Sequence, residues 1–298
     1  MKIINFGSLN IDKVYNVNNF VKAGETIASN SMKLFPGGKG LNQTIAIARA
    51  GGEVYHAGAI GYDGALLEEC LKVDKVKVDY LQRLEEPSGH AIIQVTDKGE
   101  NAIIVDSGAN GKIDNEYVDK VLMNFNKEDL LLIQNEISNV GYIIKKADEL
   151  GLTIVFNPSP ITKAMVSYPL DLVDIFILNE VEGEALTKKQ KPVEIVERLV
   201  QLYPKAKIIL TLGEKGSVYK GGDEHNQFGI YKNKVVDTTA AGDTFCGYFI
   251  TCLSKNIETA LAMKYASAAS SISISREGAT TSIPYMSEVQ EFIDNCGN

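Results

Sequence analysis

"LLLIQNEISNVGYIIKKADELGLTIVFNP" occupies residues 130–158 and has the pattern strand, helix, strand. Its two ends, residues 130–135 and 153–158, are short and mostly apolar, as expected of strands that are covered on both faces. The stretch between them, residues 138–151, has a helical pattern and ends in a glycine that suits a helix C-terminus. A unit of this kind predicts that its two strands are parallel neighbours in an α/β sheet.

The same rhythm extends along most of the chain. Short apolar segments recur on both sides of residues 130–158, and helical stretches lie between them. We therefore expect an α/β fold with a doubly wound, mainly parallel sheet, in a single domain over residues 1–298. The further expected strands are 2–7, 54–61, 175–179 and 207–212, and the further expected helices are 41–52, 242–255 and 257–275.

Two regions break this rhythm. Residues 11–36 look extended, with a turn at 22–26, and residues 88–108 have the pattern of a hairpin of two alternating strands. Together these regions predict a small antiparallel β sheet outside the main one. We expect that sheet to be a lid.

The composition argues against several classes of protein. The 298 residues carry a net charge of −8 without a dense cluster of Lys and Arg, so a nucleic-acid partner is not expected. Four scattered cysteines without a C-x-x-C pair fit a reducing compartment, and three histidines without ligand spacing argue against a zinc site. The first ten residues do not resemble a signal peptide, and no run reaches ~18 apolar residues, so we expect a cytoplasmic protein that does not span a membrane.

Small residues and two acids mark the stretch "VVDTTAAGDTF", residues 235–245. If a helix begins near Gly242, the residues before it present free backbone N–H groups, which bind anions and especially phosphates. Asp243 could then accept a proton from a hydroxyl as its oxygen attacks phosphorus. The alternative is that Asp243 is an acid that caps the helix N-terminus.

A glycine cluster lies in "FPGGKGLNQT", residues 35–44. It is not a P-loop, because Lys39 is followed by Gly40 and not by Ser or Thr. The glycines allow a tight turn before a helix, near whose start Lys39 and Asn42 would be ligand donors. The alternative is an ordinary strand-to-helix turn with a solvated lysine.

Polar residues follow the first expected strand in "GSLNID", residues 7–12. Asn10 and Asp12 share one face of an extended segment at the carboxyl edge of the sheet, where doubly wound proteins bind ligands. An amide and a carboxylate on one face suit sugar hydroxyls, although turns also often carry both residue types.

Two further motifs follow strand ends. In "NEVEGE", residues 179–184, Asn179 and Glu182 lie one helical turn apart, and such oxygen ligands suit Mg²⁺. The alternative is an acidic helix N-terminus that the helix dipole favours. The glycine turn "TLGEKG", residues 211–216, could border a nucleotide.

The order of N-x-D, GGKGxN, NxxE, TLGxxG and DTxAAGD resembles the ribokinase (PfkB-type) carbohydrate kinase family, from Gly7 to about Pro284. The resemblance implies an ATP-dependent kinase that transfers the γ-phosphate to a primary sugar hydroxyl, most closely that of D-ribose. Fructose, a sugar acid or a nucleoside stay open as substrates. A non-catalytic sugar sensor is the alternative from another class, and a dinucleotide-dependent dehydrogenase is disfavoured because G-x-G-x-x-G is missing after the first strand.

The resemblance also implies a role for each motif. Asp243 is the implied catalytic base, and the implied anion hole is formed by Ala240, Ala241 and Gly242. The implied sugar-binding residues are Asn10, Asp12, Gly38, Lys39, Asn42, Glu136 and Asp243. The implied nucleotide-binding residues are Asn179, Thr211, Gly213 and Gly216.

Two metal ions and an assembly are implied in the same way. Asn179 and Glu182 would support Mg²⁺. The implied monovalent-cation site, typically K⁺, has the residues Asp237, Thr239, Ser273, Arg276, Gly278 and Ser282. Members of this family often form homodimers through their lids.

Three residues depart from the family pattern. Tyr248 and Cys246 replace smaller or different residues in the helix behind Asp243, where we expect repacking and no loss of chemistry. His90 replaces an aliphatic residue in the expected lid. If it points at the sugar it changes substrate preference, and the alternative is a solvent-facing histidine.

Overall fold

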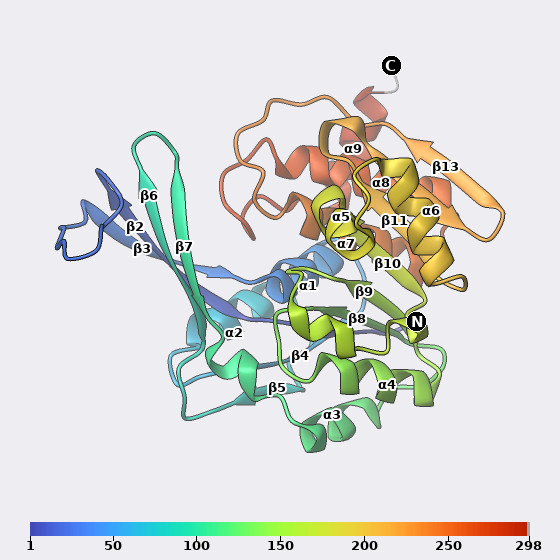
Figure 1. Cartoon of the computed structure of the whole chain (residues 1–298), viewed down its shortest axis with the longest axis horizontal. Helices are drawn as coiled ribbons and strands as arrows, with labels where there is room; N and C mark the ends of the chain where they lie inside the picture. Colours follow the sequence, from blue (N-terminus) through green and yellow to red (C-terminus); the bar gives the residue numbers. More distant parts are fainter. Residues whose placement is uncertain (297–298) are drawn as a thin grey trace.

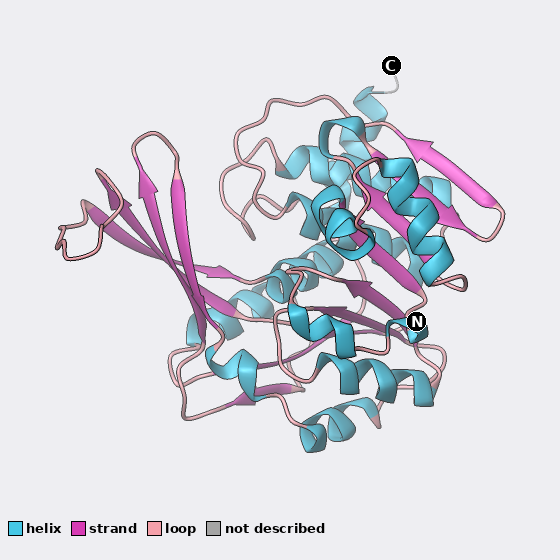
Figure 2. Cartoon of the chain, in the orientation of Figure 1, coloured by secondary structure: helices cyan, strands magenta, loops and turns pink. Residues whose placement is uncertain are grey.

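A computed structural model describes residues 1–296, and its central feature is a nine-stranded sheet (Figures 1 and 2). The strand order is β13-β12-β11-β10-β9-β8-β1-β4-β5, and the pairs from β11 to β5 are parallel, whereas β12 and β13 pair antiparallel at one edge. The bounds are β1 Ile3–Phe6, β4 Val54–Ile60, β5 Leu81–Arg83, β8 Leu130–Gln134, β9 Thr153–Asn157, β10 Ile175–Asn179, β11 Lys207–Thr211, β12 Ser217–Gly221 and β13 Glu224–Phe228. The predicted α/β fold with a mainly parallel sheet is confirmed.

Helices cover both faces of this sheet, which explains why its central strands are mostly apolar. Neighbouring residues of one strand, such as Leu132 and Ile133 of β8, point into two separate hydrophobic cores. One core is covered by α1 Lys39–Arg49, α2 Ala65–Val73, α7 Ala241–Ser254, α8 Thr259–Ser273 and α9 Met286–Cys296. The other is covered by α3 Asn115–Leu122, α4 Val140–Leu150, α5 Glu180–Thr187 and α6 Pro192–Leu202.

The glycine at the end of α4 terminates that helix, as predicted. Gly151 has φ 75°, a left-handed conformation that lets its N–H close the last helical turn at low steric cost. The 3₁₀ helices are η1 Gly108–Lys112, η2 Lys163–Ser167, η3 Leu170–Leu172 and η4 Gly213–Lys215.

The winding direction reverses between β1 and β8. From β1 the chain adds β4 and β5 on one side, and it then returns to β8 and adds β9, β10 and β11 on the other. The loops that leave the carboxyl ends of β1 and β8 therefore diverge to opposite faces of the sheet. In doubly wound folds this divergence opens a crevice for a ligand.

A second, four-stranded sheet projects from the body (left in Figure 1). Its order is β3-β2-β6-β7, with bounds β2 Asn10–Val17, β3 Ser31–Gly37, β6 Gly89–Thr96 and β7 Asn101–Asp106. The pairs β2–β3 and β6–β7 are antiparallel, and β2 and β6 join these pairs by parallel contacts. The parallel contact arises because β2 and β6 follow β1 and β5, which end at the same edge of the main sheet. We call this four-stranded sheet the lid.

The register of the lid places His90 relative to the candidate sugar-binding residues. His90 pairs with Ile11, and the next residue, Ala91, pairs with Asp12. Because paired residues share a face and neighbours alternate, His90 lies on the face opposite Asn10 and Asp12. Its Nδ1 is 3.3 Å from the carbonyl oxygen of Ser88. The register therefore disfavours the alternative in which His90 points at the sugar.

Candidate active site

The polar residues of the site begin where β1 and β8 end, at the reversal point of the sheet. Ser8 follows β1, and its hydroxyl donates to Glu136, which follows β8. The same oxygen of Glu136 accepts from the backbone N–H of Lys39 at 2.9 Å, and Ser8 Oγ accepts from the N–H of Gly40 at 3.1 Å. Burial raises the pKa of Glu136 above its ordinary value, although these donors oppose the shift. Glu136 was predicted, whereas Ser8 was missed.

Glycines allow the start of α1 to lie against β1. Gly38 has φ 97°, which places it in the conformational region that favours glycine. A Cβ on Gly40 would lie 2.2 Å from the backbone nitrogen of Ser8, so a larger residue would force the two segments apart. The glycines of the GGKG motif therefore bring the helix start into contact with the strand end.

Asn10 and Asp12 lie on one face of β2, as predicted, and Asn110 orients the first of them. Asn110 is 1% exposed and donates from Nδ2 to Asn10 Oδ1 at 2.8 Å. It is itself fixed by hydrogen bonds to the backbone N–H and carbonyl of Leu9. Asn110 lies 100 positions from Asn10 in the chain, and the contact between them was not predicted.

Asp12 is an acid in an unfavourable environment. Burial and, to a smaller extent, the nearby Glu136 raise its pKa to about 6. Its carboxylate lies against the backbone of Gly37, where a Cβ would meet Asp12 Oδ2 at 2.2 Å. Asp12 and Glu136 are therefore near enough for their charges to interact, at the base of the lid.

Asp243 lies in the first turn of α7 and is 6% exposed. Its Oδ2 accepts from Asn42 Nδ2 at 3.1 Å, and its Oδ1 accepts from Gln43 Nε2 at 2.9 Å. Within the described part of the chain, α7 has no side-chain cap, and its N-cap residue Ala240 is left-handed with φ 59°. The capping alternative for Asp243 is therefore wrong, because its carboxylate is turned to α1 and not to its own helix end.

The N-terminal turn of α7 carries small residues next to this carboxylate. Gly242 is exposed, and Ala240 and Ala241 are half-buried. The first N–H groups of a helix have no intrahelical acceptor, and the helix dipole makes them attractive to an anion. The three residues thus place backbone N–H groups beside a buried carboxylate, and that of Ala241 donates to the carbonyl oxygen of Thr238 at 3.3 Å.

Lys39 brings a positive charge to the same place. Its pKa is raised, first by the charge of Asp243 and also by Glu136 and Glu182, although burial opposes the shift. The ammonium group therefore stays charged among three carboxylates that come from separate parts of the chain.

Asn179 and Glu182 form a reciprocal capping box at the start of α5. Asn179 Oδ1 accepts from the N–H of Glu182 at 2.9 Å, and Glu182 Oε2 accepts from the N–H of Asn179 at 3.0 Å. The alternative to a magnesium site, in which the two residues form an acidic helix N-terminus, is therefore present in the structure. A role in magnesium binding would fall to the second carboxylate oxygen of Glu182, which the box leaves out.

The candidate nucleotide residues follow the neighbouring strand. Thr211 is the last residue of β11 and lies beside Asn179, the last residue of β10. Gly213 and Gly216 both have positive φ, 55° and 91°, and form the tight turn around η4. A Cβ on Gly216 would lie 2.0 Å from the carbonyl oxygen of Phe228.

Asp237 gathers several of the candidate cation residues. Its Oδ1 accepts from the N–H and the hydroxyl of Thr239, at 2.9 and 2.6 Å, and its Oδ2 accepts from the N–H of Gly278 at 3.0 Å. Ser273 and Ser282 are joined by their hydroxyls at 2.9 Å. The guanidinium of Arg276 turns away to Glu288, so a cation could use its carbonyl oxygen but not its side chain.

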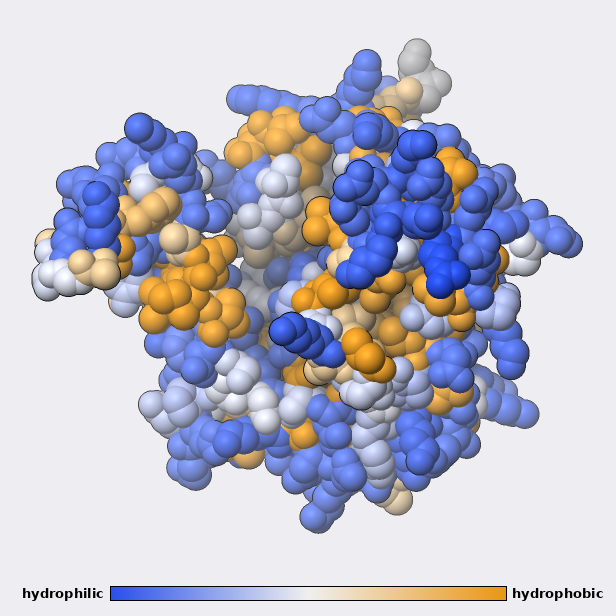
Figure 3. All heavy atoms as spheres, viewed as in Figure 1, coloured by the Kyte–Doolittle hydropathy of each residue, from blue (hydrophilic) through white to orange (hydrophobic). Residues whose placement is uncertain are grey.

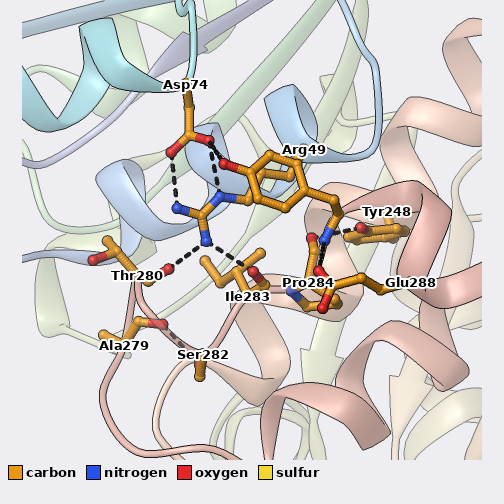
Figure 4. Close-up of polar contacts among 10 residues, drawn as sticks. Arg49, Asp74, Tyr248, Ala279, Thr280, Ser282, Ile283, Pro284 and Glu288 are labelled. Atoms are coloured by element: carbon orange, nitrogen blue, oxygen red, sulfur yellow. Dashed lines mark hydrogen bonds and ion pairs between the residues drawn. The ribbon is translucent and has the colours of Figure 1, made fainter.

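Arg49, at the end of α1, holds the segment that contains Ser282 (Figure 4). Its guanidinium makes a bidentate pair with Asp74, both contacts at 2.9 Å. Its remaining nitrogen donates to the carbonyl oxygens of Thr280 and Ile283, at 2.7 and 2.8 Å. We call these contacts the Arg49 clamp, and they were not predicted.

The departures in α7 are accommodated by packing, as expected. Tyr248 is fully buried, and its hydroxyl donates to the carbonyl oxygen of Pro284 at 2.7 Å (Figure 4). The thiol of Cys246 lies 3.6 Å from Gln43 Oε1. Both residues thus find polar partners behind the site.

Within residues 1–296, no group of three or more His, Cys, Asp or Glu side chains has the arrangement of a metal site. In the same residues, every helix is too short or too polar to cross a membrane.

Comparison with known proteins identifies the family. The model of the pfkB family carbohydrate kinase matches residues 1–286. A ribokinase of Bacillus subtilis is 32% identical over 291 residues, which are 96% of this chain and 97% of the relative. The chain belongs to the pfkB family of carbohydrate kinases, and this finding favours a kinase over the sensor and dehydrogenase alternatives.

Solved structures agree with this assignment. The ribokinase of Cryptococcus neoformans in complex with ADP has a TM-score of 0.88 and 33% identity, with 97% of this chain and 99% of that one covered. The ribokinase of Arabidopsis thaliana complexed with ribose and ATP has a TM-score of 0.87 and 28% identity, with 98% of both chains covered. The predicted ribokinase-like fold is thus confirmed.

Proposed function

We propose that this carbohydrate kinase transfers the γ-phosphoryl group of ATP to the 5-hydroxyl of D-ribose. The observation that carries the proposal is the placement of Asp243, a buried carboxylate that two side-chain amides orient at the N-terminal turn of α7. The relatives reported above support the choice of substrates, because they are ribokinases and one of them was solved with ribose and ATP.

In the proposed mechanism Asp243 is the general base. It removes the proton of the sugar hydroxyl as that oxygen attacks the phosphoryl group in line. The N–H groups of Ala240, Ala241 and Gly242 stabilise the charge that develops on the phosphoryl oxygens. Their position at the positive end of α7 adds the helix dipole to this stabilisation.

The sugar would lie between the lid and the start of α1. Asn10, Asp12 and Glu136 would accept or donate hydrogen bonds to its hydroxyls, and so would Lys39 and Asn42. Among residues 1–296, the buried Oδ1 of Asn42 has no hydrogen-bond partner, which fits a ligand hydroxyl that donates to it. Gly38 would leave room for the sugar, and lid closure would exclude water as a competing nucleophile.

The nucleotide would lie over the ends of β10 and β11, against Asn179, Thr211, Gly213 and Gly216. Glu182 fits Mg²⁺, because one of its oxygens is outside the capping box and Mg²⁺ usually keeps several waters. Bound there, Mg²⁺ would neutralise charge on the phosphates of ATP.

A monovalent cation such as K⁺ would bind near the N-terminal end of α7. Asp237 and the Thr239 backbone would supply one side of the site. Oxygens of Ser273, Arg276, Gly278 and Ser282 would supply the other. Asp237 fits this role because its pKa is lowered by hydrogen bonds from Thr239 and Gly278, although partial burial opposes the shift.

Assembly and location are part of the proposal as well. Apolar residues of the lid are exposed on β3 and β7, and Figure 3 shows hydrophobic side chains gathered on this projecting sheet. We infer that the protein forms a homodimer through the lid, and we keep the prediction that it is cytoplasmic.

A coupled assay of ADP release tests the substrate. D-Ribose, 2-deoxy-D-ribose, D-fructose, a sugar acid and a nucleoside are compared at equal concentration, with and without K⁺. We expect D-ribose to have the highest kcat/KM. A higher value for any other acceptor would refute ribose and retain the kinase.

The variant Asp243→Asn tests the base. A general base contributes ~10²–10⁴-fold to the rate, so we expect kcat to fall by at least that range. Ribose binding, measured by calorimetry, should remain detectable. Near-normal turnover in this variant would be incompatible with Asp243 as the base.

A further inference from the structure

Gln43 binds the carboxylate of Asp243 and takes no part in the proposed mechanism. Gln43 is 0% exposed and lies in α1 next to Asn42. Its amide nitrogen donates to Asp243 Oδ1 at 2.9 Å and to Asn157 Oδ1 at 3.0 Å. One side chain thus ties the first turn of α7 to the end of β9.

Gln43 is the last member of a ladder of buried amides beneath the site. Its Oε1 accepts from Gln134 Nε2 at 2.7 Å, and Gln134 also donates to Asn5 Oδ1 at 3.0 Å. Asn5 in turn donates to the carbonyl oxygen of Gly40 at 2.9 Å. Asn5 and Gln134 come from β1 and β8, so the ladder crosses the sheet at its reversal point.

The two ends of the ladder fix the direction of every amide. A carboxylate and a backbone carbonyl can only accept hydrogen bonds. Asp243 therefore requires the nitrogen of Gln43 to face it, which turns Gln43 Oε1 to the nitrogen of Gln134. At the other end, the carbonyl of Gly40 requires the nitrogen of Asn5. A flip of any one amide would place two acceptors against each other in the core.

A neutral histidine, His56, also takes part in this hydrogen-bond network. His56 is fully buried, and its Nε2 lies 3.2 Å from the carbonyl oxygen of Gly7, which can only accept. Its Nδ1 must therefore accept from the hydroxyl of Thr44, at 2.8 Å, and Thr44 accepts from Asn5. Burial lowers the pKa of His56 to about 4, so the ladder stays uncharged around neutral pH.

We propose that Gln43 is a positioning residue that sets the direction of the Asp243 carboxylate through this ladder. The inference rests on the proposed role of Asp243 as the base. Asn42 also contacts Asp243, but in the proposed complex it binds the sugar as well. Gln43 lies wholly behind the carboxylate, so its hold does not depend on the substrate.

A rotated carboxylate would bind substrate and fail to take its proton. Proton transfer requires the base within hydrogen-bond reach of the hydroxyl, and a displacement of ~1 Å can cost about 10²-fold in rate. Because Gln43 touches neither substrate in the proposed complex, its loss should lower kcat and leave the sugar KM nearly unchanged.

The test is Gln43→Met, which keeps the length of the side chain and removes its amide. We expect kcat to fall about 10- to 100-fold, with the ribose KM and the calorimetric Kd within about threefold of wild type. Gln43→Asn is the second variant, in case the first does not fold. Its amide is one methylene too short to reach both partners, so a smaller fall in kcat is expected.

Thr251→Val is the matched control for stability. Thr251 is also fully buried between α7 and α1, where its hydroxyl donates to the carbonyl oxygens of Gly247 and Ile47 at 2.8 and 3.3 Å. Its loss removes a buried hydrogen bond at the same interface without touching Asp243. We expect a lower Tm with wild-type kcat.

A double-mutant cycle separates this proposal from the proposed function. In the Asp243→Asn background, Gln43→Met should have almost no further effect on kcat, because the group that it positions is gone. Full additivity of the two effects, or wild-type kcat in folded Gln43→Met and Gln43→Asn, would overturn the positioning role. Near-normal turnover of Asp243→Asn alone would instead overturn the assignment of the base.

Discussion

Among single residues, Asp12 combines a proposed role in sugar binding with a cost in stability. Its pKa of about 6 in the folded protein exceeds the ordinary value of 3.8. The folded state therefore binds the proton more tightly than the unfolded state does. The resulting stabilisation is complete below about pH 4 and is lost as the pH rises through 6. Near neutral pH the folded protein thus holds an ionised carboxylate that burial disfavours.

Asp12→Asn should remove this cost. We expect the ligand-free variant to melt about 2–4 °C above wild type at pH 7.5, with the difference vanishing toward pH 4. Scanning calorimetry between pH 4 and 8 measures it. The ribose KM should rise at least about tenfold, because a charged acceptor of sugar hydroxyls is lost. Asp97→Asn, in the exposed β6–β7 turn, is the control, and an equal pH dependence in both variants would contradict the prediction.

Among the elements, the Arg49 clamp joins α1 and α2 to the segment before α9. The side chain of Arg49 is largely buried, and the side chain of Asp74, the C-cap residue of α2, is 2% exposed. The hydroxyl of Tyr285 also donates to Asp74 at 3.0 Å. The segment that this clamp holds contains Ser282, and it follows the N–H of Gly278 that binds Asp237. The clamp therefore couples a helix of the proposed sugar site to the candidate cation site.

Arg49→Lys should weaken activation by K⁺. The lysine keeps the charge but loses the planar fork that reaches Asp74 and two carbonyl oxygens together. We expect the K⁺ concentration for half-maximal activity to rise about tenfold, with kcat restored at saturating K⁺. Rates are measured against KCl at an ionic strength held constant with tetramethylammonium chloride. Arg83→Lys, at an exposed pair with Glu68, is the control. An unchanged K⁺ response would show that the segment is held without the clamp.

At the scale of the whole molecule, the lid exposes apolar side chains whose exposure to water would be unfavourable in a monomer. On β7, Ile103 and Ile104 are 53% and 64% exposed and lie on opposite faces of the sheet. Leu34 and Phe35 are similarly exposed on β3. Burying both faces requires a partner that encloses the sheet, which a second lid could do.

Replacing Ile103 and Ile104 together with Glu should dissociate the proposed homodimer. Charges on both faces would have to be desolvated in a lid–lid interface. Sedimentation velocity should show a dimer for the wild type and a monomer for the variant. Val166→Glu, at a residue that is 93% exposed on η2, adds a comparable charge away from the lid and should stay dimeric. A wild-type monomer would refute the assembly.

Much of the architecture follows from local sequence. Strands such as β8 and β9 were predicted because an unbroken apolar run needs cover on both faces. The start of α7 was predicted because small residues precede a stretch in which apolar residues recur at helical spacing. Such signals depend on neighbours within a few residues, so they can be recognised in the sequence without the rest of the fold.

The residues that were missed act through distant contacts. Ser8 meets Glu136 across 128 positions, and Gln43 meets Asp243 across 200. In the sequence a buried glutamine that orients a carboxylate looks like any glutamine on a helix surface. Asn179 and Glu182 show the converse, since a pattern typical of metal ligands also makes a capping box.

By itself, the sequence determined most strands of the main sheet, the helices α1, α4, α7 and α8, and the carboxylate at the start of α7, because backbone preference and hydrophobic periodicity act over short distances. It did not predict the strands β5, β12 and β13 or the helices α2, α3, α6 and α9. The tertiary structure decided which way that carboxylate points and which face of the lid His90 occupies. It also decided that Gln43 belongs to the site. The reason is physical: an amide or a carboxylate takes its direction from its partners, and here those partners come from strands and helices far apart in the chain.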